Sequence, residues 1–75
     1  MKIDFDGSGN MYAELHSSDY GGKKEFLRIT LVEKELGNPC FRFQIRENKG
    51  RLRAMGPEFP VTGLDELIAA LNNLK

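Results

Sequence analysis

A strict alternation of apolar and polar residues at positions 41–46 constrains the fold more than any other feature of the chain. The apolar positions are Phe41, Phe43 and Ile45, and the polar ones are Arg42, Gln44 and Arg46. Because successive side chains of a strand point to opposite faces of a sheet, this segment predicts a strand with one apolar face and one arginine-bearing face. A sheet face that carries arginines indicates an anionic ligand.

The same period of two recurs along the chain, between segments rich in turn residues. We expect strands at 2–5, 11–16, 25–33, 40–47 and 51–55. Asn48-Lys49-Gly50 favours a hairpin between the last two, because Asn and Gly both tolerate positive φ. Pro57 and Pro60 are expected to break regular structure after residue 55, since proline cannot donate a hydrogen bond to a sheet.

One helix is expected, at the C-terminal end. Its apolar stripe at helical spacing consists of Leu64, Leu67, Ile68, Leu71 and Leu74. Thr62 is the expected N-cap, with Asp65 three residues later. The apolar stripe is expected to pack on the sheet or against a second helix. The predicted fold class is therefore α+β. It consists of a four- to five-stranded antiparallel meander sheet followed by one C-terminal helix, in a single domain spanning residues 1–75.

The length of the chain and its cysteine content set further expectations. A domain of 75 residues buries only roughly 60% of the surface that its unfolded chain exposes, so a homodimer is expected to supply the missing burial. Cys40 is the only cysteine, which rules out an internal disulfide and fits a reducing cytosol. Neither a signal peptide nor a membrane-spanning run is recognisable, so we expect a cytoplasmic protein.

The net charge of zero hides an uneven distribution. Residues 1–22 carry one basic and four acidic side chains, residues 37–57 carry five basic and one acidic, and residues 58–75 carry one basic and three acidic. Two interpretations stay open at this point. The basic middle either binds an anion or forms solvent-exposed ion pairs, which contribute little to stability.

No catalytic or metal-binding signature accompanies the basic segment. Residues 4–9 resemble the start of a calcium loop, but its twelfth position is Leu15 and Glu14 falls one place early, so we expect a polar turn. His16 is the only histidine, and no nucleophile or acid stands at a telling distance from it. We therefore expect no enzymatic activity, no catalytic residue, no metal and no cofactor.

Several short motifs together resemble the positive cofactor four family of single-stranded-DNA-binding transcriptional coactivators and their short bacterial relatives. They are Lys24-Glu25 at a strand start, Phe43-Gln44-Ile45-Arg46, the basic Arg51-Leu52-Arg53, Met55-Gly56 and the leucine-rich final helix, within residues 23–74. The resemblance implies a four-stranded antiparallel sheet, a C-terminal helix, a homodimer, and nucleic acid held along curved basic sheets. One departure is that Ala54-Met55-Gly56-Pro57 stands where the family has a glycine-lysine-glycine.

Two functions follow as hypotheses. In the first, the chain is a nucleic-acid-binding module, with single-stranded DNA as the expected ligand of a basic sheet face. Its expected phosphate-binding residues are Arg28, Arg42, Arg46, Lys49, Arg51 and Arg53. Tyr12 or Tyr20 would stack on bases, while Phe41 and Phe43 belong to the core. In the second, the chain is a small protein-interaction module, such as a phage-type inhibitor or an accessory subunit, with a charged protein partner.

Overall fold

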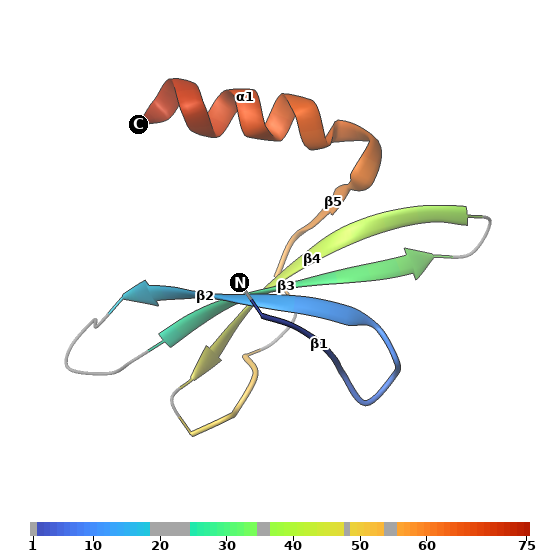
Figure 1. The fold of residues 1–75 in the computed structure, drawn as a ribbon, viewed down its shortest axis with the longest axis vertical. Coiled ribbons are helices and arrows are strands. Elements are labelled where there is room, and N and C mark those ends of the chain that lie inside the picture. The colour runs from blue at the N-terminus through green and yellow to red at the C-terminus, as the bar shows by residue number, and fades with distance from the viewer. Residues whose placement is uncertain (1, 19–24, 35–36, 48, 54–55) are drawn as a thin grey trace.

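The computed structural model describes residues 2–18, 25–34, 37–47, 49–53 and 56–75. Five antiparallel strands form one sheet in the order β1-β2-β3-β4-β5 (Figure 1). The strands are β1 (Ile3–Phe5), β2 (Met11–Ser18), β3 (Glu25–Lys34), β4 (Asn38–Glu47) and β5 (Glu58–Pro60). A short 3-10 turn, η3 (Val61–Gly63), leads into the helix α1 (Leu64–Leu74). The predicted meander sheet with one C-terminal helix is confirmed.

The strand register gives the sheet two chemically distinct faces. Directly paired residues of an antiparallel sheet share a face, so the register assigns each side chain. The apolar side chains of one face are Ile3, Phe5, Met11, Ala13, Leu15, Leu27, Ile29, Leu31, Phe41, Phe43, Ile45 and Phe59, and Glu25, Glu33, Pro39 and Glu47 lie at the ends of the same face. The polar face carries Asp4, Tyr12, Glu14, His16, Phe26, Arg28, Thr30, Arg42, Gln44, Arg46 and Glu58, together with Val32, Cys40 and Pro60. Phe41 and Phe43 thus lie on the other face of the sheet from Arg42 and Arg46, as their alternation predicts.

The last strand lies further along the chain than the sequence predicts. Of the expected strand at 51–55, Leu52 forms an isolated bridge with Arg46, and residues 54 and 55 lie outside the described part. The fifth strand is instead Glu58–Pro60, which pairs with residues 40–42 of β4. The expectation that Pro60 breaks the sheet is wrong, because it is the last residue of an edge strand, where proline is tolerated.

Two glycines bring the chain around β5 close to its neighbours. A Cβ atom on Gly56 would collide with the carbonyl oxygen of Phe43, so β4 can lie this close only to a residue without a side chain. A Cβ atom on Gly63 would lie 2.7 Å from the ring of Phe59. The Phe59 ring therefore packs against the backbone of η3 and fixes the point from which α1 leaves the sheet.

The helix starts differently from the prediction. Its N-cap residue is Gly63, and no side chain caps the first turn, while Thr62 lies inside η3. The predicted Thr62 cap is therefore wrong, because the 3-10 turn moves the first helical residue to Leu64. Asp65 and Glu66 do lie in the first turn, as expected, where their charges interact favourably with the helix dipole.

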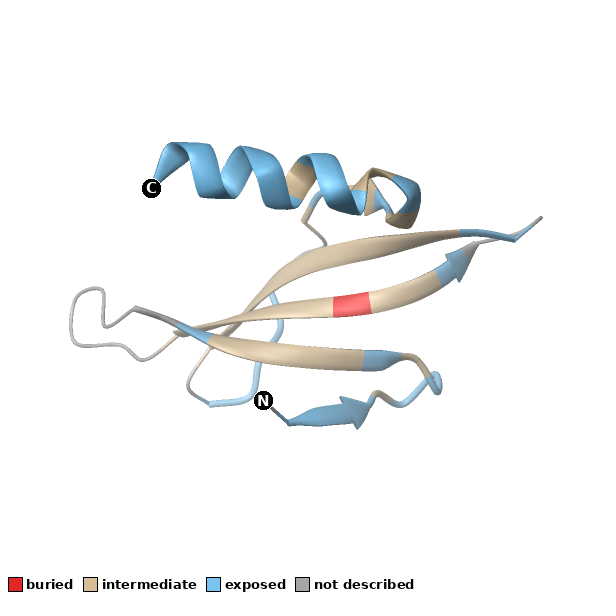
Figure 2. Cartoon of the chain, turned by 45° about the horizontal axis from the view of Figure 1, so that its top comes forward, coloured by how far each residue is buried: buried red, intermediate tan, exposed pale blue. Residues whose placement is uncertain are grey.

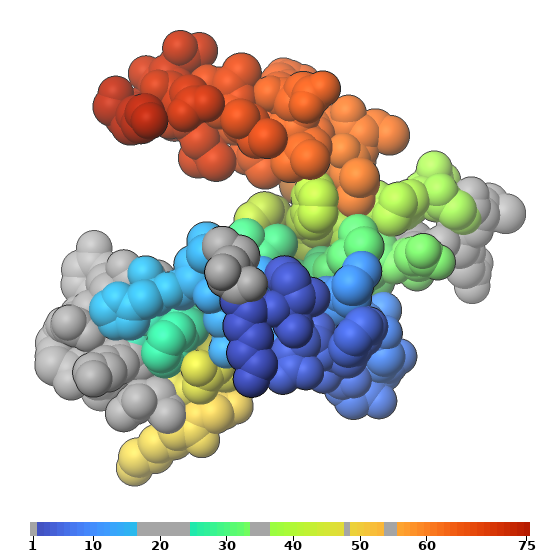
Figure 3. Space-filling view, viewed as in Figure 1, coloured from blue at the N-terminus to red at the C-terminus, as the bar shows by residue number. Residues whose placement is uncertain are grey.

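The helix does not cover the sheet, and the predicted packing of its apolar stripe on the sheet is wrong for the single chain. Leu64, Ile68, Leu71 and Leu74 are 38%, 47%, 58% and 83% exposed. α1 extends away from its attachment at β5, with open space between its C-terminal half and the strands (Figure 3). Burial colouring shows a mostly exposed helix above a half-buried sheet (Figure 2). Among the described residues no apolar side chain is buried, and Thr30, 3% exposed, is the only buried residue.

Candidate functional site

The polar face brings charged and aromatic side chains from four strands into three rows across the sheet. One row runs from Tyr12 through Thr30 and Arg42 to Glu58. The next contains Glu14, Arg28 and Gln44, and the third contains His16, Phe26 and Arg46. Three of the six predicted phosphate-binding residues, Arg28, Arg42 and Arg46, therefore share this face.

Glu14 is the centre of the polar face. The Nε–H groups of Arg28 and Arg46 both donate to its Oε2 atom, over donor–acceptor distances of 3.0 Å and 2.5 Å. Arg28 lies directly opposite Glu14 on β3, whereas Arg46 reaches it from β4. One carboxylate thus holds two guanidinium groups, and this cluster keeps one positive charge.

These contacts change the acidity of Glu14. Burial raises the pKa of its carboxyl group, but the hydrogen bonds from Arg46 and Arg28, together with their charges, lower the pKa by more, so the net pKa falls below the ordinary value of 4.5. Glu14 therefore stays ionised at neutral pH. Its contacts stabilise the fold more when the carboxylate is charged than when it is protonated.

We predict an acid-sensitive contribution of Glu14 to stability. Because the folded-state pKa is lowered, the contribution is fully present above the unfolded value and is lost as the pH falls through the folded value. Urea unfolding at several pH values between about 3 and 7 should show that Glu14→Gln loses less stability on acidification than the wild type. Glu33→Gln, which changes an exposed carboxylate at the end of β3, should retain the wild-type pH dependence. Identical pH profiles for all three proteins would contradict this prediction.

Two guanidinium groups of the polar face lie over aromatic rings. The Cζ atom of Arg28 is 3.8 Å from the centroid of the Tyr12 ring, and that of Arg46 is 4.4 Å from the centroid of the Phe26 ring. The ring of His16 meets Phe26 edge-on at a centroid distance of 5.6 Å. A guanidinium group that covers a ring has a second planar face, on which a nucleic-acid base can stack.

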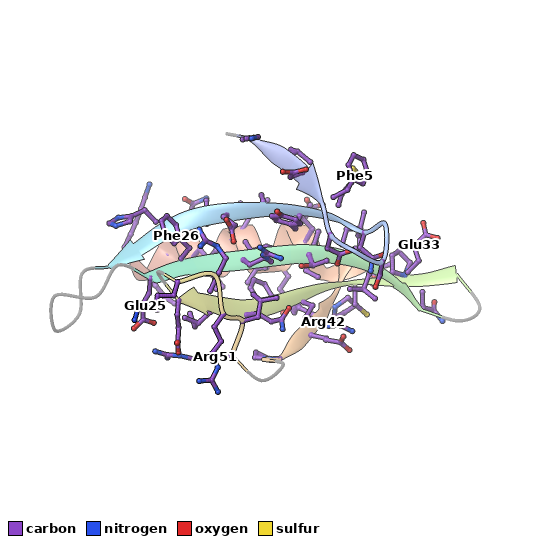
Figure 4. The ribbon with its side chains drawn as sticks, turned by 90° about the horizontal axis from the view of Figure 1, so that it is seen from below. Phe5, Glu25, Phe26, Glu33, Arg42 and Arg51 are labelled. Atoms are coloured by element: carbon purple, nitrogen blue, oxygen red, sulfur yellow. The ribbon has the colours of Figure 1, made fainter. Side chains whose placement is uncertain are left out.

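Arg42 is held by a carboxylate of the neighbouring strand. Its guanidinium group donates to Glu58 on β5 at 2.9 Å, and Glu58 is its direct cross-strand neighbour. Figure 4 shows the Arg42 side chain on β4 near this edge of the sheet. The three arginines and two glutamates of this face leave one net positive charge, and Lys2 and Asp4 at the edge of the sheet cancel each other.

Arg51 and Arg53, which are expected to bind phosphates on the same basic sheet face, do not share the polar face with Arg42 and Arg46. Leu52 is the residue paired with Arg46, so its neighbours Arg51 and Arg53 alternate to the other side. Arg53 donates to Glu47 at 3.2 Å and to Glu25 at 3.0 Å, on the side of the apolar face. Its pKa is raised by the hydrogen bond to Glu47 and the charge of Glu25.

The remaining basic residues of the hairpin are exposed. Arg51 projects beyond the strands (Figure 4), and Lys49 lies in the turn that Gly50 closes with a φ of 88°. Within the described part of the chain neither residue forms an ion pair. Both can contact a ligand at the hairpin end of the sheet.

The other candidates from the sequence have simpler structural roles. One carboxylate oxygen of Asp6 accepts the backbone N–H groups of Ser8 and Asn10, each at 2.9 Å, which makes residues 6–10 a polar turn. Tyr20 lies outside the described residues. In the described part of the chain, no helix is long and apolar enough to cross a membrane.

Sequence reasoning missed two residues of this site, Glu14 and Phe26. Their positions alternate with Ala13 and Leu27, which indicates the polar face, but alternation alone does not show which carboxylate meets which arginine. Glu14 is 32 residues from Arg46 in the chain. Only the register of three strands brings the two residues into contact.

Comparisons with protein families, with curated proteins and with solved structures found no match to this chain. Functional inference therefore rests on the chemistry of the polar face and on the exposed apolar surfaces.

Proposed function

We propose that the polar face of the sheet binds single-stranded nucleic acid, with single-stranded DNA as the ligand to test first. The observation that carries the proposal is the layering of Arg28 over Tyr12 and of Arg46 over Phe26 on one solvent-accessible face. Single-strand binding surfaces combine such stacking platforms with cationic groups that contact the backbone. The resemblance to the positive cofactor four family favours the same ligand.

The mechanism assigns separate roles to rings and charges. Bases stack on the outer planes of the guanidinium groups and on exposed ring edges, while the N–H groups of Arg28, Arg42 and Arg46 contact phosphates. The phenylalanines of the apolar face take no part, because they lie on the other side of the sheet. No covalent step is involved, so the chain acts as a binding protein rather than an enzyme.

We also propose that the chain functions as a homodimer. Its accessible surface is 5897 Å², whereas a compact monomer of 8.5 kDa exposes about 4,700 Å². The radius of gyration is 13.3 Å, against about 11 Å for a compact chain of 75 residues. The excess of about 1,200 Å² exceeds the roughly 800 Å² that each partner buries in a standard interface.

A second copy fits the uncovered surfaces of the chain. The apolar face of the sheet and the stripe of α1 are both incompletely covered, and a hollow lined by Ile3, Met11, Tyr12, Ala13, Ile29 and Phe41 opens on the sheet. A two-fold dimer would bury both surfaces at once and leave the two polar faces open to solvent. The lone Cys40 suits the reducing cytoplasm that we expect for such a protein.

The nucleic-acid proposal is tested by fluorescence anisotropy with a labelled oligo-dT. Binding should be detectable at about 50 mM salt and weaken as salt rises. In a plot of the logarithm of the binding constant against the logarithm of the salt concentration, three arginines per chain should give a slope of about −2 for each chain that contacts the strand. Absence of binding at the lowest salt would contradict the proposal.

A specific observation favours the alternative, a protein-interaction module. Each arginine of the polar face has a carboxylate partner, and such mixed charge also suits a charged protein surface. If oligo-dT and oligo-U both fail to bind to the folded protein, this alternative becomes the better account.

A further inference from the structure

We propose that Glu14 occupies the place of a ligand phosphate between Arg28 and Arg46, and that the ligand must displace this carboxylate in order to bind. This inference rests on the proposed function and deepens it, because it makes an acidic residue the main determinant of affinity. The chain would then bind single strands more weakly than its arginines allow.

The first support is the geometry of the donors. Two Nε–H groups from neighbouring strands converge on the single Oε2 atom of Glu14. Convergent guanidinium donors on one anionic oxygen are also the arrangement that binds a phosphate oxygen. The carboxylate and a phosphate therefore compete for the same donors.

The second support is the balance of charge. The single carboxylate of Glu14 must serve two arginines, Arg28 and Arg46, and this cluster keeps one positive charge at the centre of the face. A phosphodiester is attracted to this residual charge before it makes any direct contact. The cluster thus attracts an anion even though its donors are occupied.

The third support is access. The side chains of Arg28, Arg46 and Glu14 are 14%, 20% and 21% exposed, so the cluster is reachable from solvent. A polar hollow beside it is lined by Lys2, Asp4, Tyr12 and Glu14. The displaced carboxylate can turn into this hollow, where the opposite charges of Lys2 and Asp4 leave no net repulsion.

The test compares oligo-dT affinities by anisotropy for the wild type, Glu14→Gln and Glu33→Gln. Both variants remove one negative charge, but only Glu14→Gln replaces the charge-assisted hydrogen bonds of the two arginines by weaker bonds to a neutral amide oxygen. We expect Glu14→Gln to bind about tenfold more tightly than the wild type, since about one charge-assisted contact no longer has to be broken. Glu33→Gln should change the affinity by less than about twofold, because an exposed charge away from the site acts only through screened attraction.

A double-mutant cycle separates competition from a structural role. Arg46→Ala should cost more affinity in the Glu14→Gln background than in the wild type, because only there is Arg46 fully available to the phosphate. Glu14→Asp keeps the charge on a shorter side chain, so its affinity should lie between those of the wild type and Glu14→Gln. It replaces Glu14→Gln in the test if that variant does not fold. Circular dichroism confirms the fold of each variant.

The outcomes separate the two proposals. If the wild type binds but neither Glu14 variant binds more tightly, the displacement proposal is overturned and the nucleic-acid proposal stands. If no folded variant binds oligo-dT or oligo-U at low salt, both are overturned. An equal gain for Glu14→Gln and Glu33→Gln would show a general charge effect and would also overturn the role of Glu14.

Discussion

A Leu71→Asp variant should sediment as a monomer and lose its cooperative thermal transition. Leu71 lies at the middle of the exposed stripe of α1, and no apolar side chain among the described residues is buried within one chain. In the proposed dimer interface a carboxylate would have to be desolvated, and the contacts proposed for Leu71 would be lost. The expected cost is at least about 3 kcal/mol per chain, which is a large part of the stability of so small a domain. Sedimentation equilibrium and thermal melting measure the two effects.

The matched control is Asn73→Asp. It adds the same charge to the last turn of α1, where the helix dipole disfavours it equally, but on the side away from the apolar stripe. This control should remain a dimer, and its melting temperature, like that of the wild type, should rise with protein concentration. A wild-type chain that stays monomeric at high micromolar concentration would rule out the dimer.

An Arg46→Ala variant should bind oligo-dT about tenfold more weakly, because one phosphate contact and one stacking surface are removed together. The logarithmic salt slope should become shallower by about 0.7, the contribution of one single-strand phosphate contact. Stability should also fall by about 1 kcal/mol, since Arg46 is bonded to Glu14 and covers Phe26. The anisotropy titration is therefore made well below the melting temperature.

Two further variants test whether the effect of Arg46→Ala depends on the planar guanidinium group and on its position on the polar face. Arg46→Lys keeps the charge but loses the planar group over Phe26, so its affinity should lie between those of the wild type and Arg46→Ala. Arg51→Ala removes the same charge from the exposed hairpin on the other side of the sheet, and it should bind almost as well as the wild type. If Arg51→Ala weakens binding as much as Arg46→Ala, the ligand lies at the hairpin and not on the polar face.

The fold could be predicted largely from alternation. Residues 41–46 fix which side chains of β4 share a face, and the spacing from Leu64 to Leu74 predicts the helix. The position of β5 could not be predicted, because Pro57 and Pro60 indicate a break, and only the structure shows that Pro60 ends an edge strand. The uncovered helix was also missed, since amphipathicity shows that a helix needs a partner but not where that partner lies.

The site was predictable only in part. The alternation at positions 41–46 indicated a cationic face, and it correctly separated Phe41 and Phe43 from Arg42 and Arg46. It did not show that Glu14 holds two of these arginines, because that contact depends on the register of β2, β3 and β4. Nor did it show that Leu52 pairs with Arg46. Because this pairing puts Leu52 on the polar face, its neighbours Arg51 and Arg53 lie on the apolar side of the sheet.

The most direct test of the central claim is a ¹H–¹⁵N NMR titration that follows the arginine Nε–Hε resonances during addition of oligo-dT. These signals report on side chains and therefore distinguish the two sides of the sheet, which backbone amides do not. We expect progressive shifts for Arg28, Arg42 and Arg46, whose guanidinium groups would exchange carboxylate for phosphate partners, and little change for Arg51 and Arg53. Shifts confined to Arg51 and Arg53, or no shift at any arginine at low salt, would contradict this claim.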